Sequence, residues 1–149
     1  MKRVIIAALL VTAGSVYADA QVQTSGTNAS FLVETAVLQQ PVPIADSAQW
    51  KDRYRSFFDT YDIPTDTNMY QAYAEVLYQY ARILKHEGQY EQAVQIIDKN
   101  KRVQLWGHVQ HMLLSYRATI LTSWAESEKD SKKTELLNEA ERTIKSMQW

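Results

Sequence analysis

Two histidines, His108 and His111, have the type and spacing of a pair of metal ligands. Residues three apart on a helix share one face, so both rings could bind one ion. A zinc site needs at least a third ligand, and no aspartate or glutamate of the same predicted helix is spaced to supply it. We therefore interpret the pair as polar residues at the start of a helix and expect no metal site.

Carboxylates are the second candidate for chemistry. Asp59, Asp62 and Asp66 cluster around Pro64, but they lack the glycine and the terminal glutamate of a calcium-binding loop, so helix capping and solvation explain them better. The chain has no nucleophile elbow, phosphate-binding loop or dinucleotide fingerprint. The sequence therefore predicts a protein that is not an enzyme and needs no cofactor. A small hydrolase with dispersed carboxylates is the least favoured alternative.

Tyrosines are the third candidate, since the chain has nine of them and four tryptophans. Bulky rings with a polar tip suit both helix–helix seams and binding grooves. Tyr73 and Tyr80 fit the apolar face of a predicted helix and are expected in its core. Tyr70 and Tyr78 lie off that face and are predicted to bind a partner protein, with a place in the core as the alternative.

The elements that carry these residues are predicted to be helices. Apolar residues recur at spacings of three and four, and no window alternates well enough for a strand. The predicted helices span about 47–61, 69–87, 90–101, 105–127 and 132–147. Pro64 ends the first helix and Gly88 the second. The fold class is all-α, built as antiparallel helical hairpins.

The region before the first predicted helix, residues 19–46, reads as an extended or flexible leader. Its beginning is polar and small, and Pro41 and Pro43 impose an extended path. The short apolar stretches within residues 31–38 are compatible with a strand or a helical turn. The helical domain is therefore expected to span residues 47–149.

Residues 1–18 have the three parts of a secretory signal peptide. Lys2 and Arg3 precede a short apolar run, and small residues follow up to Ala18, our first choice for cleavage, with Ala20 as the second. The apolar run is too short for an ordinary membrane span. The compact signal is typical of bacteria, so we expect a periplasmic protein, with secretion as the alternative and membrane contact only through the cleaved signal.

Composition limits the remaining classes. Removing the signal leaves 131 residues, enough for one domain, with 14 basic and 17 acidic residues, a net charge of −3. That charge argues against nucleic acid as a partner. The absence of cysteine excludes disulfides, a lipid anchor and zinc held by thiolates.

One predicted hairpin resembles the tetratricopeptide repeat. The segment LYQYARILKHEGQYEQAVQII carries Leu77, Ala81, Gly88, Tyr90 and Ala93 at the spacing of that motif. The resemblance implies that the two alanines let the helices approach closely, that the glycine makes the turn, and that the aromatic ring packs into the hairpin. It also implies a right-handed stack of hairpins.

The resemblance covers about 75 residues and weakens after the first hairpin. Asn100 and Leu105 replace the small residue and the proline that are usual there. In the next hairpin, Leu137, Ala140 and Ile144 resemble Tyr90, Ala93 and Ile97, after a longer loop. Such repeats usually need three units, so the helix at 47–61 is expected to act as a cap or half a unit.

The predicted function is that of an exported, non-catalytic module that binds a protein of the bacterial envelope through a helical-repeat groove. The alternative is a secreted effector or inhibitor that blocks an enzyme through its N-terminal leader. The identity of the partner and the oligomeric state do not follow from the sequence.

Overall fold

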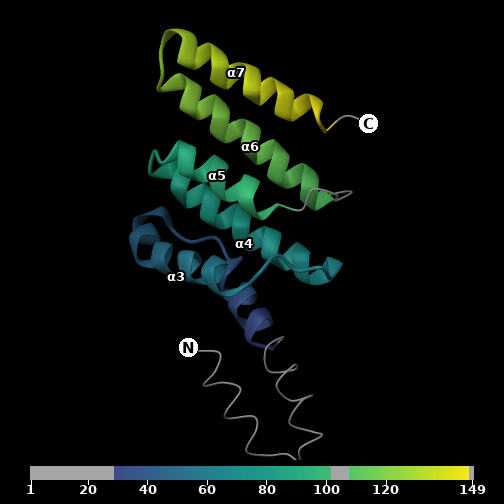
Figure 1. Ribbon diagram of the computed structural model, residues 1–149. Helices are drawn as coiled ribbons and strands as arrows, with labels where there is room; N and C mark the ends of the chain where they lie inside the picture. The colour runs from purple at the N-terminus through teal and green to yellow at the C-terminus, as the bar shows by residue number, and fades with distance from the viewer. Residues whose placement is uncertain (1–28, 102–107, 148–149) are drawn as a thin grey trace, which may run out of the picture.

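The computed structural model describes residues 29–101 and 108–147, and this part of the chain is all-α (Figure 1). It contains an N-terminal helix (residues 29–38), the short 3-10 helix η1 (Ile44–Asp46), and the helices α3 (Ser47–Thr60), α4 (Thr67–His86), α5 (Tyr90–Asn100), α6 (His108–Glu126) and α7 (Asp130–Lys145). No strand occurs in the described ranges. The predicted fold class is confirmed, whereas the predicted signal, residues 1–18, lies outside the described residues.

The helices pack as a stack in chain order. Helix α4 packs on α5, α5 on α6 and α6 on α7, and α4 also contacts α6. Figure 1 shows this ladder rising from the N-terminal helix at the bottom to α7 at the top. The six α-helices of the described ranges form one packed bundle, which is compatible with a helical-repeat fold.

An aromatic cluster joins α3 to α4. Tyr54 and Phe58 of α3 both stack on Tyr80 of α4, with ring centroids 5.6 and 5.7 Å apart. Phe58 also meets Tyr73 edge-on at 5.2 Å. Tyr73 and Tyr80 are buried, so the expectation that these two tyrosines belong to the core is confirmed.

The structure differs from the predicted extended leader over residues 29–38, which are helical. Phe31, Thr35 and Leu38 are at most 2 % exposed, and their spacings of four and three form one buried stripe. Val42 is also buried after the helix ends. Tertiary packing of this stripe favours a helix despite the flanking polar residues and prolines, so the folded domain begins well before residue 47.

Polar contacts fasten this segment to the later helices. The Tyr54 hydroxyl donates a 2.7 Å hydrogen bond to the Leu38 carbonyl, and Arg82 donates to the Val42 carbonyl at 2.8 Å. Arg53 pairs with Glu34 at 2.7 Å. The segment is therefore held by α3 and α4 together.

The turn between α4 and α5 forms as the repeat resemblance implies. Gly88 has φ +78°, and the Gly88 and Gln89 amides donate to the Lys85 and Leu84 carbonyls at 3.0 and 2.9 Å. This pair of bonds is the Schellman motif, which favours glycine because of the left-handed backbone.

The side chains that carry the repeat resemblance are buried or partly buried in this hairpin. Leu77, Ala81 and Ala93 have no exposed surface, and Tyr90 is partly buried against the core. The small alanine side chains let α4 and α5 approach closely.

The second hairpin repeats this burial pattern. Three buried residues of α4 have counterparts of the same type in α6, each 44 positions further along the chain, and all six are at most 6 % exposed. The pairs are Ala74 with Ala118, Leu77 with Leu121, and Ala81 with Ala125. Helices α4 and α6 thus hold equivalent places in the stack.

The resemblance of the second hairpin is only partly reflected in burial. Leu137 and Ile144, which resemble Tyr90 and Ile97 in that comparison, are 42 and 48 % exposed, whereas Leu136, Ala140 and Thr143 are buried. Thr143 can occupy an inward position because its hydroxyl donates to the Glu139 carbonyl at 2.9 Å.

Candidate functional site

The most distinctive surface feature is a pair of tyrosines where α4 meets α6. The rings of Tyr78 and Tyr116 meet edge-on with centroids 4.7 Å apart, and both are only partly buried. Burial raises the pKa of Tyr116 to about 12, Tyr78 adds to this rise and the positive charge of Arg82 opposes it. The Tyr116 phenol is therefore neutral near pH 7 and able to donate a hydrogen bond.

Helix α4 extends this surface in both directions. Gln71, Glu75, Tyr78 and Arg82 are spaced by four, three and four residues, which places them on one side of the helix. We name these four residues, with Tyr116, the tyrosine face. Arg82 is oriented by its bonds to the Val42 carbonyl at 2.8 Å and to Gln79 at 3.0 Å.

A polar hollow of about 460 Å³ lies at one end of the tyrosine face. Gln39 and Gln40, after the N-terminal helix, form one wall, and α4 forms the other with Asn68, Gln71, Ala72 and Glu75. Carboxamides both donate and accept hydrogen bonds. The hollow therefore adds carboxamides and the Glu75 carboxylate to the polar groups of the tyrosine face.

The two residues predicted to bind a partner, Tyr70 and Tyr78, lie in different environments. Tyr78 is partly exposed, whereas Tyr70 is only 1 % exposed and its ring lies 6.1 Å from that of Tyr73 in the core. This burial corrects the prediction for Tyr70. Tyr116 was missed, because its place in the apolar register of its helix concealed that it is only partly buried.

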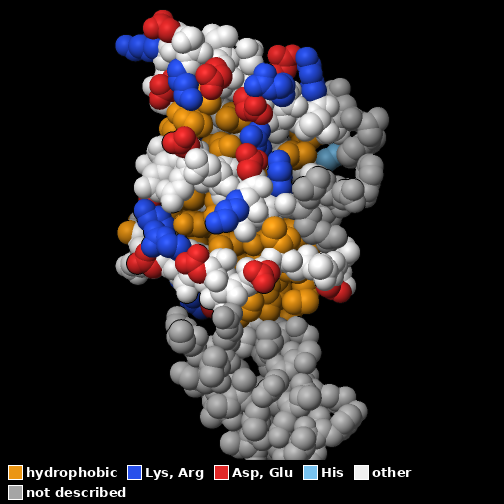
Figure 2. Space-filling view, viewed as in Figure 1, with side chains coloured by type: hydrophobic (Ala, Val, Ile, Leu, Met, Phe, Trp, Pro, Cys, Tyr) orange, Lys and Arg blue, Asp and Glu red, His pale blue; other side chains and the backbone are white. Residues whose placement is uncertain are grey.

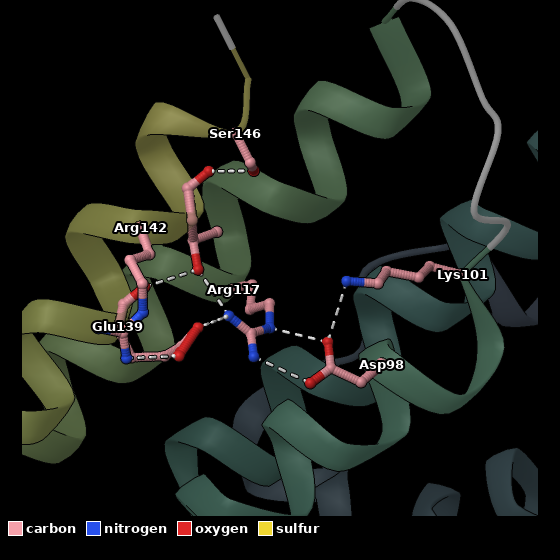
Figure 3. Close-up of polar contacts among 7 residues, drawn as sticks. Asp98, Lys101, Arg117, Glu139, Arg142 and Ser146 are labelled. Atoms are coloured by element: carbon pink, nitrogen blue, oxygen red, sulfur yellow. Dashed lines mark hydrogen bonds and ion pairs between the residues drawn. The ribbon is translucent and has the colours of Figure 1, made fainter.

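A second polar site, the Arg117 network, joins α5, α6 and α7 (Figure 3). Arg117 of α6 donates two bonds to Asp98 of α5, at 2.8 and 2.9 Å. It also donates to Glu139 and Thr143 of α7, at 3.2 and 2.5 Å. One guanidinium thus holds three helices through its planar fork.

The charged side chains of the Arg117 network form ion pairs with one another. Lys101 also pairs with Asp98, and Arg142 with Glu139. Burial raises the pKa of Asp98, but the hydrogen bonds and charges of Arg117 and Lys101 outweigh it and leave that pKa lowered. A hollow of about 260 Å³ borders these residues. We assign the network to stability, since each carboxylate already has a cationic partner.

The other carboxylates and histidines considered as candidates for chemistry have structural roles or do not lie close together. The Asp66 carboxylate accepts a 2.9 Å bond from the Met69 amide, so the capping role predicted for it is confirmed. His108 begins α6 and is exposed. Within residues 29–101 and 108–147, no three metal-ligating side chains gather around a common point.

The same ranges contain no helix that is long and apolar enough to cross a membrane. Comparison of the chain with known protein families, with curated proteins and with solved structures finds no match. The function is therefore inferred from the geometry of the tyrosine face.

Proposed function

We propose that this protein is an exported, non-catalytic module of the tetratricopeptide-repeat type that binds another protein of the bacterial envelope. The binding site is the tyrosine face, and the partner docks there as an extended segment or a helix. The observation that carries this proposal is the Tyr78–Tyr116 ring pair, which is partly exposed where the two equivalent helices of the stack meet.

The low charge of α6 supports the proposal. Apart from its histidines, α6 has only two side chains that are charged at neutral pH, Arg117 and Glu126, and Arg117 is engaged in its network. Helix α7 has eight ionised residues out of 16, and Figure 2 shows charges gathered over it at the top. The cores of protein interfaces are depleted of charge and enriched in tyrosine.

The mechanism follows from the chemistry of these groups. A partner covers the two rings and so removes apolar area from water, while the neutral phenols and the carboxamides of the hollow bond to its polar groups. The face is carried by two packed helices, so little conformational entropy is lost on binding.

The proposal is tested by capturing partners from an envelope extract, identifying them by mass spectrometry and measuring their affinity for variants. Tyr78→Ala and Tyr116→Ala should each weaken binding about 10-fold or more, as expected for interface tyrosines. Tyr90→Ala is the matched control, because Tyr90 is also a partly buried tyrosine but begins α5 and is not part of the tyrosine face. An affinity that falls equally in all three variants, or that follows their loss of stability, contradicts the proposal.

The alternative, an inhibitor that acts through its leader, needs a narrower test than deletion of the whole leader. Residues 29–46 contain core side chains such as Phe31 and Leu38, so their removal would unfold the domain. Deletion of residues 21–28 leaves that core in place. Inhibition of an envelope enzyme that disappears with this short deletion favours the inhibitor.

A further inference from the structure

The polar hollow at the end of the tyrosine face carries one unbalanced negative charge. None of the six described residues that line it is a lysine, arginine or histidine, and Glu75 is the charged one among them. Glu75 is partly buried and has no cationic partner within the described residues. Two other partly buried carboxylates, Glu34 and Glu139, are each paired with an arginine, at 2.7 and 3.2 Å. The Glu75 carboxylate is therefore available to pair with a bound cation.

The carboxamides around Glu75 add hydrogen-bond acceptors to this charge. The Gln40 amide nitrogen already donates to the Ala36 carbonyl at 3.4 Å, which leaves the Gln40 side-chain oxygen to accept. The side chains of lysine and arginine have only donors, three and five N–H groups respectively. A lysine or arginine side chain therefore matches the hollow in charge and in hydrogen bonding, whereas a carboxylate would be repelled by Glu75.

Arg82 determines which end of the tyrosine face attracts a cation. It lies seven residues after Glu75 on the same side of α4, about 10 Å along the helix axis, with Tyr78 between them. Its guanidinium is held by neutral groups, Gln79 and the Val42 carbonyl, at 3.0 and 2.8 Å. Its positive charge therefore repels a cation from that end of the face and leaves the hollow as the favourable place.

The hydrogen-bonding groups of the hollow favour an extended segment over a helix. The interior peptide groups of a helix are bonded within the helix, whereas an extended segment can offer its N–H and C=O groups to carboxamides such as Gln71. Alternate side chains of an extended segment point to the same side and lie about 6.6 Å apart. Glu75 and Tyr78, three residues apart on a helix, have a similar separation of about 5–6 Å between their Cβ atoms. A cationic residue in the hollow thus places the residue two positions away on the ring pair.

We propose that the partner docks as an extended segment whose lysine or arginine side chain occupies the hollow and pairs with Glu75. An apolar side chain two positions away in this segment covers Tyr78 and Tyr116. The inference rests on the proposed function, since it specifies the partner of the same face.

Nuclear magnetic resonance titrations of the isotope-labelled protein with capped synthetic peptides test this inference. The probe is Ser-Gly-Ser-Lys-Ser-Leu-Ser-Gly-Ser, and a second peptide has glutamine in place of its lysine. The lysine peptide should bind about 3-fold more tightly or better, as expected for one ion pair at a partly buried site. Glu75→Gln should abolish this preference. Glu91→Gln is the matched control, because it removes the same charge from an exposed position in the first turn of α5 and should retain the preference.

Butylamine tests whether a peptide is needed, since it offers a similar cation without a main chain. It should bind more weakly than the lysine peptide. Equal binding would indicate a site for small amines and overturn the extended segment, as would a lysine peptide that shows no binding at millimolar concentration.

Tyr78→Ala separates failure of this inference from failure of the proposed function. It should weaken both peptides by the same factor. Equal affinities for the lysine and glutamine peptides, or a preference that persists in Glu75→Gln, would overturn the cation site alone if Tyr78→Ala still weakens binding. Peptide affinities that Tyr78→Ala leaves unchanged would contradict the tyrosine face itself.

Discussion

Truncation of Phe31 to alanine tests whether the N-terminal helix is a true part of the core. Phe31 is 2 % exposed, and its ring lies 5.9 Å from that of Phe57 and 5.3 Å from that of Tyr61. The substitution removes a buried ring and leaves a cavity against α3. Changes of this type cost about 3–5 kcal/mol of the free energy of unfolding.

The matched control is Leu32→Ala in the next position of the same helix. Leu32 is 55 % exposed, so its truncation should change the free energy of unfolding by about 0.5 kcal/mol or less. Both substitutions introduce alanine, which favours a helix. The difference between them therefore reports burial.

Urea denaturation followed by circular dichroism measures both variants. With an m-value of about 2 kcal/mol per molar urea, the midpoint for Phe31→Ala should fall by about 2 M and that for Leu32→Ala should barely move. Amide hydrogen exchange over residues 29–38 provides a local readout, with protection expected to follow that of α3. Equal midpoints for the two variants would mean that Phe31 is not part of the core, and the segment would again be interpreted as a leader.

Three further predictions concern the hairpins. Tyr73→Phe removes the 2.7 Å bond to Asn100 and leaves a buried acceptor, so unfolding experiments should show a loss of about 1–3 kcal/mol, and a loss near zero would contradict the role of the bond. Gly88→Ala should cost about 1 kcal/mol because of its φ of +78° alone, since an added Cβ meets no atom within 4 Å; a stabilised variant would be inconsistent with that backbone. The pKa of Asp98 is lowered in the folded protein, so its contribution is complete above about pH 4, the unfolded value, and is lost as the pH falls through the lowered native pKa. Thermal melts of wild type and Asp98→Asn should therefore converge below pH 4, and an unchanged gap would exclude this carboxylate as the cause.

The helices could be predicted from the sequence because their signals are local. Apolar spacing identified α3 to α7, and Gly88 marked the turn between α4 and α5. The N-terminal helix was missed because its buried stripe is short and its partners, such as Tyr54 and Phe57, lie far along the chain. Its stability comes from tertiary packing, which a local pattern does not report.

The candidate site was predicted only in part for a related reason. Tyr70 and Tyr78 are both off the main apolar stripe of α4, yet only Tyr70 is buried. Which side of α4 is covered depends on how the neighbouring helices surround it. Likewise, Tyr116 joined the candidate face only when the structure placed α6 beside α4, since neither residue indicates the other in the sequence.

The burial of the N-terminal helix also bears on the predicted cleavage of the signal peptide. Ten residues, 19–28, separate the predicted cleavage site at Ala18 from this helix. The folded part begins at this helix, because Phe31 and Leu38 are buried. In a chain exported as we propose, cleavage at Ala18 therefore removes none of the side chains that form the core.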